Sequence, residues 1–326
     1  MDLQQLGWNA HFSGHFESIK QDGLVPARIA VQQKGIYIVY SEFGELEAEV
    51  SGRFRYEAEA KREYPTIGDW VAIQPMPSGS KAVIHHLLPR TSFFSRKAKG
   101  IQTEEQIVAG NIDTVFIVTG LDRDFNLRRI ERYLTLAWQS SASPVVVLNK
   151  TDLCPDLEQA IAEVDAIAFG APILALSAIQ GQGLEGLAPY LRPGLTVAML
   201  GSSGVGKSTI INALLGEERL LVRNTSEHDG RGQHTTTWRE LVLLPEGGMI
   251  IDNPGMREIQ LWSDEESLKD AFGDVEKLRA RCRFSDCTHT NEPGCAVREA
   301  LETGGLDRKR FKSYQKIQRE LKFLKT

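Results

Sequence analysis

The sequence predicts a multidomain α/β protein with a small β-barrel first, a doubly wound and mostly parallel sheet in the middle, and a helical segment last. Short runs rich in Val, Ile and Tyr fill the first part of the chain, strands alternate with helices after about residue 110, and a polar helical stretch surrounds a group of cysteines near the end. A length of 326 residues accommodates two or three domains. We expect three, at residues 1–95, 96–262 and 263–326.

The composition, charge and cysteine usage exclude several classes of protein. With 41% hydrophobic and 25% charged residues, the chain is neither disordered nor fibrous. No apolar run approaches the roughly 18 residues of a membrane span, and the N-terminus lacks the basic and apolar regions of a secretory signal. The net charge of −5 creates no general attraction to nucleic acid. Four cysteines are too few for a disulfide scaffold, which favours a reducing, cytoplasmic location.

The N-terminal segment reads as a small all-β unit. Turn-forming pairs such as Lys34-Gly35 and Phe43-Gly44 separate its apolar runs. Five strands suit an OB-type barrel that binds RNA, although an SH3-like barrel has a similar number of strands. The predicted strands are residues 24–32, 35–41, 45–56, 69–76 and 81–88.

A linker over residues 90–100 mixes cations with aromatic residues. Cations contact phosphates and aromatic rings stack on bases, so one interpretation is an RNA-contacting strip. The other is a solvated linker whose phenylalanines pack on a domain. The residues concerned are Arg90, Phe93, Phe94, Arg96, Lys97 and Lys99.

The middle of the chain alternates strands and helices, which predicts a mostly parallel sheet covered on both faces. Asn126 is a candidate cap for a helix whose apolar residues, from Leu127 to Ala137, follow a 3.6-residue period. Two short runs joined by residues 245–248 predict a hairpin in the same sheet. The predicted strands are residues 113–119, 144–148, 172–176, 195–200, 241–244 and 249–252.

Residues 201–208 match the phosphate-binding pattern G-x-x-x-x-G-K-[ST], between an apolar strand and a helix. The glycines let backbone N–H groups surround phosphate oxygens at a helix N-terminus. Lys207 is expected to reach the β- and γ-phosphates, and Ser208 to ligate Mg²⁺. The full set of expected nucleotide-binding residues in this loop is Gly201, Ser202, Ser203, Gly204, Val205, Gly206, Lys207, Ser208 and Thr209.

Asp252-Asn-Pro-Gly255 follows an apolar strand about 50 residues after that loop. A carboxylate at such a strand end can hold Mg²⁺ opposite the phosphate-binding loop, often through water. The backbone N–H of Gly255 is placed to bond a γ-phosphate. The alternative is an ordinary turn.

Asn149-Lys-Thr-Asp152 follows another buried strand and resembles the guanine-reading motif of GTPases. A carboxylate at Asp152 accepts both the N1–H and the N2–H₂ of guanine, which adenine does not supply. Asn149 is expected to hold the loop and the base edge, the stem of Lys150 to lie on the ring, and Thr151 to complete the loop. Ser177-Ala178, just after a strand, resembles the accompanying loop.

The order of these motifs is unusual. In most GTPases the phosphate-binding loop comes first, whereas here the base-reading motifs precede it and Asp252–Gly255 comes last. The same sheet can be built with relocated termini because natural termini often lie close together. The sequence therefore predicts a circularly permuted GTPase domain. In such a domain the γ-phosphate-sensing loop leads directly into the cysteine-containing segment, so ordering of the loop could move that segment.

Residues 224–237 read as the switch I loop. Either Thr235 or Thr236 is the expected second Mg²⁺ hydroxyl, with entry to a strand as the alternative for these threonines. Met256 stands where many GTPases place a water-positioning glutamine, and a thioether cannot orient water. We therefore expect slow intrinsic hydrolysis, with help from a partner or, as a hypothesis, from His234.

Cys282, Cys287, His289 and Cys295 supply three thiolates and an imidazole, a closed set that suits one structural, tetrahedral Zn²⁺. Cys154 lies far upstream and is expected to be an ordinary thiol. Residues 306–326 carry eight Lys and Arg against two acidic residues, 8 − 2 = +6, with apolar residues at helical spacing. This predicts a basic amphipathic helix, which either contacts RNA or packs on its own domain.

Over nearly its full length, the chain resembles the RsgA (YjeQ) family of small-ribosomal-subunit-dependent GTPases. The resemblance rests on the order of NKTD, GSSGVGKST, GRGQHTTT and DNPG, followed by C-x4-C-x-H-x5-C. It implies an OB-fold, a permuted GTPase domain and a zinc-finger domain. It further implies late maturation of the small (30S) subunit, binding to its rRNA near the decoding centre, and conversion of GTP to GDP and phosphate stimulated by the subunit. We expect a monomer that binds no membrane.

Two other functions compete with this one. A GTP-dependent placeholder on RNA, with incidental hydrolysis, draws support from Met256. A P-loop kinase of a small metabolite is disfavoured by the NKTD motif and by the absence of an evident acceptor site.

Overall fold

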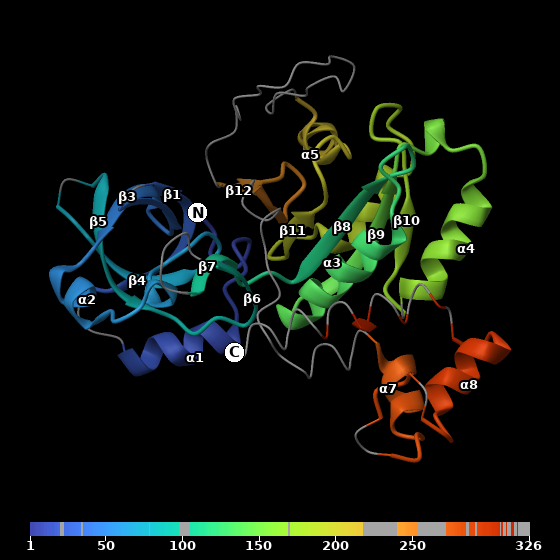
Figure 1. The fold of residues 1–326 in the computed structure, drawn as a ribbon. Helices are drawn as coiled ribbons and strands as arrows, with labels where there is room; N and C mark the ends of the chain where they lie inside the picture. The colour runs from blue at the N-terminus through green and yellow to red at the C-terminus, as the bar shows by residue number, and fades with distance from the viewer. Residues whose placement is uncertain are drawn as a thin grey trace, which may run out of the picture.

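The fold was analysed in a computed structural model of the chain. It describes residues 1–326 apart from 20–22, 34, 78, 98–104, 169, 218–239, 253–271, 285–286, 291, 307, 309–310, 312–313, 316–317 and 319–326. Figure 1 shows a barrel at the N-terminal end, a sheet flanked by helices beside it, and two short helices, α7 and α8, below that sheet.

The N-terminal strands close into a five-stranded barrel with the order β1-β2-β3-β5-β4-β1. The β3–β5 pair is parallel, and the other pairs are antiparallel. A helix, α2, lies between β3 and β4, as in an OB-fold. The strands are β1 (Val25–Gln33), β2 (Ile36–Ser41), β3 (Gly44–Val50), β4 (Trp70–Pro75) and β5 (Lys81–Leu87).

Two helices of this region differ from the sequence prediction. The strand predicted over 45–56 ends at Val50, and α2 (Gly52–Glu57) follows, because the Ser51 side chain accepts a hydrogen bond from the Phe54 N–H at 3.0 Å and caps the helix. The prediction for residues 51–56 was therefore wrong. The helix α1 (Ala10–Ile19) was not predicted, and it buries Phe12 against Trp70 and Phe16 against Trp8.

A two-stranded hairpin connects the barrel to the central sheet. It consists of β6 (Phe93–Lys97) and β7 (Glu105–Gly110), so the predicted linker over 90–100 contains a strand. Phe94 is buried, whereas Phe93 is 41% exposed.

The central strands follow the order β10-β9-β8-β11-β13-β12, parallel except for β12, which forms the predicted hairpin with β13. The three strands β8, β9 and β10 precede the phosphate-binding loop in sequence yet extend the sheet on one side of β11, which is the permuted arrangement. The strands are β8 (Thr114–Gly120), β9 (Ser143–Asn149), β10 (Ile173–Ala175), β11 (Thr196–Leu200), β12 (Glu240–Leu243) and β13 (Met249–Asp252).

Alternating side chains of these strands fill two separate apolar layers, one on each face of the sheet. In β8, Val115 and Ile117 join the layer that contains α3 and α4, whereas Phe116 and Val118 join the layer that contains α5 and η3. Asn126 caps α3 as predicted, accepting from the Arg129 N–H at 3.1 Å. The helical elements are α3 (Leu127–Gln139), η2 (Thr151–Leu153), α4 (Leu157–Ala168), η3 (Leu184–Tyr190) and α5 (Lys207–Leu215).

The barrel and the central sheet form one hydrogen-bonded surface of 11 strands, because β1 pairs with β12 through Val31 and Glu240. Arg28 of β1 is 2% exposed and reaches across this junction. Its guanidinium donates to the carbonyl of Leu6, to that of Asn111 at 3.0 Å and to the Thr196 hydroxyl at 2.8 Å. Burial lowers the pKa of Arg28 to about 10, while Asp113 and Asp69 oppose that shift, so the side chain stays charged at neutral pH.

The C-terminal part contains α7 (Gly273–Arg279) and α8 (Ala296–Thr303), which pack around the cysteine cluster. The predicted basic helix over 306–326 falls mostly outside the described residues. Among the residues that are described, no helix has the length and apolar character needed to cross a membrane.

Candidate active site and metal centre

The motifs predicted from sequence meet at the carboxyl edge of the central sheet. The loops that follow β8, β9, β10, β11 and β13 all leave this edge, because these strands are parallel. Ligands of open α/β sheets bind in this position. Segments that are far apart in sequence, such as the strand ends at Gly120 and Asp252, therefore become neighbours around one site.

The phosphate-binding loop joins β11 to α5, whose first residue is Lys207. Gly206 has φ +98, and a Cβ at that position would lie 2.2 Å from the Asn149 side-chain nitrogen, so the site requires glycine. The Lys207 ammonium donates to the carbonyls of Gly201 and Ser202, each at 2.7 Å. The cation is thus held over the loop, next to the N-terminus of α5, where an anion is favoured.

Asn149 ties the base-reading loops to the phosphate-binding loop. Its side-chain nitrogen donates to the Val205 carbonyl at 2.8 Å, and its side-chain oxygen accepts from the Ala178 N–H at 3.1 Å. Asn149 is 2% exposed. One buried amide therefore fixes three of the predicted motifs relative to one another.

Asp152 is exposed in the short helix η2, and its carboxylate accepts a hydrogen bond from the buried Ser177 hydroxyl. Lys150, just before η2, has the left-handed φ of +65, which turns the chain so that Asp152 follows on the outer side of the loop. Ser177 thus orients the carboxylate that was predicted to read guanine.

Asp252 ends β13, and its neighbour Ile251 pairs with Ala198 of β11. The carboxylate therefore lies at the same edge as the phosphate-binding loop. The other predicted residues around the γ-phosphate, His234, Thr235, Thr236, Gly255 and Met256, lie outside the described residues.

The structure adds two acidic residues that the sequence analysis missed. Asp122 and Asp124 follow β8, and they contact Lys150 and Ser202, respectively. Their signal in the sequence is an acidic pair directly after a buried strand that ends at the site edge.

Known proteins are similar to this chain in sequence and in fold. The family model described as RsgA GTPase matches residues 87–262. The "Small ribosomal subunit biogenesis GTPase RsgA" of Opitutus terrae is 50% identical to this chain over 98% of its length, and the match covers 90% of that relative. The chain belongs to the RsgA GTPase family. A second relative, "Small ribosomal subunit biogenesis GTPase RsgA 1" of Oceanobacillus iheyensis, is 46% identical over 94% of this chain and 89% of its own length.

Solved structures support the family's fold for the whole architecture. YjeQ from Thermotoga maritima superposes with a TM-score of 0.69 at 29% identity, over 91% of this chain and 98% of that one. YloQ, described as a circularly permuted GTPase, matches with a TM-score of 0.66 at 22% identity, over 92% of this chain and 96% of that one. The predicted barrel, permuted sheet and C-terminal cysteine cluster are thus confirmed as the fold of this RsgA-family chain.

Three cysteines and one histidine form a metal-binding cluster at the C-terminal end of this RsgA-family chain. The ligand atoms of Cys282, Cys287, His289 and Cys295 all lie within 4.8 Å of one another. The Cys282 and Cys295 sulfurs are 3.9 Å apart, and the His289 Nδ1 lies 3.6 Å from the first and 3.4 Å from the second. A tetrahedral zinc would separate such ligand atoms by about 3.5–3.8 Å. The donor set and its spacing therefore fit a closed four-ligand site.

The surroundings of Cys282 and His289 favour the forms in which these side chains bind a metal, whereas burial raises the pKa of the Cys287 thiol to about 11. Burial raises the pKa of the Cys282 thiol, but hydrogen bonds from the backbone N–H groups of Val297 and Ala296, at the start of α8, outweigh it and lower the pKa overall. Burial and the charge of Arg279 lower the pKa of His289, which favours the neutral imidazole. His289 has φ +61, its Nδ1 faces the sulfurs of Cys282 and Cys295, and its buried Nε2 has no hydrogen-bond partner among the described residues.

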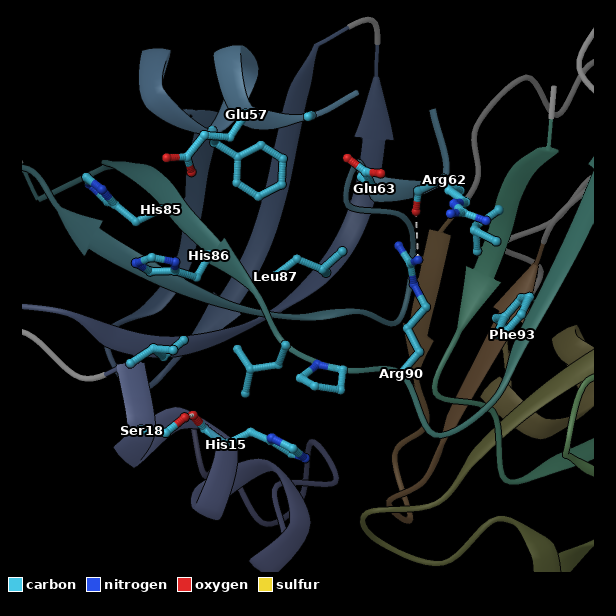
Figure 2. A pocket seen from close by; sticks show the side chains of 16 residues that line it. His15, Ser18, Glu57, Arg62, Glu63, His85, His86, Leu87, Arg90 and Phe93 are labelled. Carbon is cyan, nitrogen blue, oxygen red and sulfur yellow. Dashed lines mark hydrogen bonds between the residues drawn. The ribbon is translucent and has the colours of Figure 1, made fainter. Parts of the chain in front are cut away.

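The barrel carries a separate groove of about 790 Å³, away from the phosphate-binding loop. Figure 2 shows His85 and His86 at one end, Arg90 and Phe93 at the other, and His15 and Ser18 of α1 opposite. Arg90 does not support the RNA-strip interpretation of the linker, because it pairs with Asp69 at 2.7 Å and donates to the Arg62 carbonyl at 2.9 Å. Among the strip residues whose side chains the structure describes, Phe93 is exposed and lines the groove.

Proposed function

We propose that this protein is a GTPase that binds the small ribosomal subunit, assists its late maturation, and hydrolyses GTP to GDP and phosphate when the subunit stimulates it. The observation that carries the GTPase assignment is Asn149, which fixes the guanine-reading loop against the phosphate-binding loop. The ribosomal part rests on the relatives of this chain, which are named small ribosomal subunit biogenesis GTPases.

Base recognition rests on Asp152. Its carboxylate accepts from N1–H and N2–H₂ of guanine, and Ser177 holds it in orientation. Adenine offers no matching pair of donors, so ATP is rejected because the carboxylate would stay unpaired. The stem of Lys150 covers one face of the base.

Phosphate recognition rests on Lys207 and the N-terminus of α5, which stabilise charge on the β- and γ-phosphates. Ser208 and Asp252 would hold Mg²⁺, together with Thr235 or Thr236. The ion supplies positive charge at the phosphates when it is bound. Water attacks the γ-phosphorus, the bond to the bridging oxygen breaks, and GDP leaves with that electron pair.

The backbone N–H of Gly255 is the proposed donor to the γ-phosphate. Since Met256 cannot orient water, the proposed role of the subunit is to complete the site, with His234 as the candidate group within this chain. Because a group needed to orient water comes from the subunit in this proposal, the free protein would hydrolyse GTP slowly.

The metal of the C-terminal cluster is proposed to be one Zn²⁺, with Cys282, Cys287, His289 and Cys295 as its ligands. Four protein donors leave no open position, so its role is structural. The observed separations of the donor atoms support this choice.

Contact with rRNA is proposed for the barrel at 1–95 and for the basic C-terminal segment of the unit at 263–326, on either side of a GTPase unit at 96–262. Phe93 at the start of β6 is 41% exposed and Tyr56 on α2 of the barrel is 91% exposed, so both rings are accessible for base stacking. A monomer that works in the cytoplasm fits this role.

The test is GTP hydrolysis by the purified protein alone, with small subunits, and with large subunits. We expect small subunits alone to raise turnover by about two orders of magnitude or more, as partner-completed GTPases do. A Lys207→Ala variant is the control for contaminating activity. Equal turnover in all three conditions, with GTP still bound, would overturn the ribosomal assignment.

The same assay separates two finer points. A His234→Ala variant that binds GTP and keeps the full stimulated rate would exclude His234 as a catalytic residue. A placeholder with incidental hydrolysis, which Met256 favours, predicts subunit binding that depends on GTP but turnover that subunits leave unchanged.

A further inference from the structure

Asp122 and Asp124 lie on the loop between β8 and α3, and each contacts a different nucleotide-binding motif. Neither residue belongs to a motif that reads the base or the phosphates. We propose that this loop is a brace that positions the two halves of the nucleotide site, with Asp122 and Asp124 as its positioning residues. The inference rests on the proposed GTP site and adds two side chains to it.

Asp122 holds the lysine of the guanine-reading motif. The Lys150 ammonium donates to the Asp122 carboxylate at 2.6 Å, and both side chains are about a quarter exposed, 21% for Lys150 and 27% for Asp122. Burial raises the pKa of Asp122, but the hydrogen bond from Lys150 and that from the Asp124 N–H lower it overall, so the carboxylate is ionised at neutral pH. With its ammonium fixed, the Lys150 stem is kept over the place of the base.

Asp124 holds the phosphate-binding loop. Its carboxylate accepts from the Ser202 hydroxyl, and its other oxygen accepts from the Arg129 guanidinium at 2.9 Å. Arg129 lies in the first turn of α3 and also donates to the Asp124 carbonyl at 2.8 Å. The hydroxyl of Ser202 is therefore anchored to a helix on the far side of the loop.

The brace itself is tied to the sheet. The Leu121 N–H donates to the Asn149 carbonyl at 2.8 Å, and the Asp124 N–H donates to the Asp122 carboxylate at 2.9 Å. Space is limited at its start, because a Cβ on Gly120 would lie 3.0 Å from the Asp122 carboxylate. A loop fixed in this way lowers the entropy lost when the nucleotide binds, and so raises affinity.

The role predicts a specific pattern of binding. The Lys150 stem contacts the face of the purine ring, which is the same in guanine and xanthine. Asp152 reads the edge of the base, where the two differ. Loss of Asp122 should therefore weaken GTP and XTP equally, and loss of Asp152 should change their ratio.

The experiment measures affinities of the full chain for GDP, GTP and XTP in wild type and in Asp122→Asn, Asp124→Asn and Asp165→Asn. Asp165 lies exposed on α4 and provides a matched control with the same chemical change. We expect about tenfold weaker GDP and GTP binding for the first two variants, an unchanged GTP-to-XTP ratio, and wild-type binding for the third. A Lys150→Met background should abolish the effect of Asp122→Asn, because the two side chains act as a pair.

Three outcomes would contradict the proposal. Wild-type affinity in both Asp122→Asn and Asp124→Asn overturns the brace and leaves the GTPase assignment intact. A full effect of Asp122→Asn in the Lys150→Met background overturns the Asp122–Lys150 pairing as its cause. If the wild-type chain binds no guanine nucleotide, the proposed function fails, and the brace fails with it.

Discussion

At the scale of single residues, recognition depends on a few side chains whose orientation is fixed by buried hydrogen bonds. Asp152 is exposed, but the buried Ser177 hydroxyl orients it, and the buried Asn149 sets the distance between its loop and the phosphate-binding loop. Residues of this kind are preorganised, so the free-energy cost of ordering them when the nucleotide binds is small.

Replacement of Asp152 by asparagine should change which base is bound. The amide donates a hydrogen bond where the carboxylate accepted one, which suits the C2 oxygen of xanthine and leaves the guanine N–H groups unpaired. We expect GTP affinity to fall by about 10- to 100-fold and the preference to shift toward XTP. Competition between fluorescent GDP and each triphosphate measures both, and an unchanged preference would show that Asp152 does not read the base.

The local motifs could be predicted from sequence because their chemistry lies within a few consecutive residues. For Gly206, Lys207 and Asn149, the motif and the preceding strand were enough to predict their position at the edge of the sheet. Asp122 and Asp124 could not be recognised in this way, because their partners Lys150 and Ser202 lie 28 and 78 positions away and meet them only through the strand order of the sheet.

At the scale of elements, the errors of prediction lie where tertiary contacts outweigh local preference. Residues 51–56 contain Phe54 and Tyr56, which favour strands, yet the Ser51 cap and the turn of the barrel produce α2. The helix α1 has few apolar residues, and its stability comes from the packing of Phe12 against Trp70 and of Phe16 against Trp8. The strands β8, β9 and β11 were predictable because each contains a continuous run of buried apolar residues.

The helices α7 and α8 should depend on the metal. With 7 and 8 residues, they are too short to be stable alone, and the cysteine cluster lies between them. We expect chelation, or Cys287→Ser, to reduce the helical circular dichroism and to make the segment after residue 272 sensitive to protease, with guanine nucleotide binding retained.

The matched control for this prediction is Cys154→Ser, which removes a thiol outside the cluster. It should leave both signals unchanged. Full resistance to protease after complete removal of zinc would show that the two helices are held by packing alone.

At the scale of the whole molecule, Arg28 joins the barrel to the central sheet. Its guanidinium satisfies carbonyl and hydroxyl groups from the N-terminal segment, from the residues that precede β8, and from β11. It also lies over the ring of Trp70, 5.7 Å from the centroid. Four regions of the chain that are far apart in sequence therefore share one buried cation.

Replacement of Arg28 by methionine should destabilise the protein by about 3 kcal/mol or more, because the buried carbonyls at Leu6 and Asn111 lose their donor and the charge of Asp113 loses its nearby cation. Urea unfolding followed by tryptophan fluorescence measures the change. Arg53→Met is the control, since the Arg53 side chain is 78% exposed and pairs only with Glu57 in the contacts described. Equal midpoints for the two variants would contradict the role given to Arg28.

The pairing of β1 with β12 has a practical consequence for anyone who divides this chain. A fragment that begins after the barrel would leave β12 as a bare edge strand, with unpaired backbone groups open to a second molecule. The barrel expressed alone would expose the charged guanidinium of Arg28, which is buried in the intact chain. Truncated versions should thus precipitate or associate during purification, and the undivided chain is the form to produce for binding and structural work.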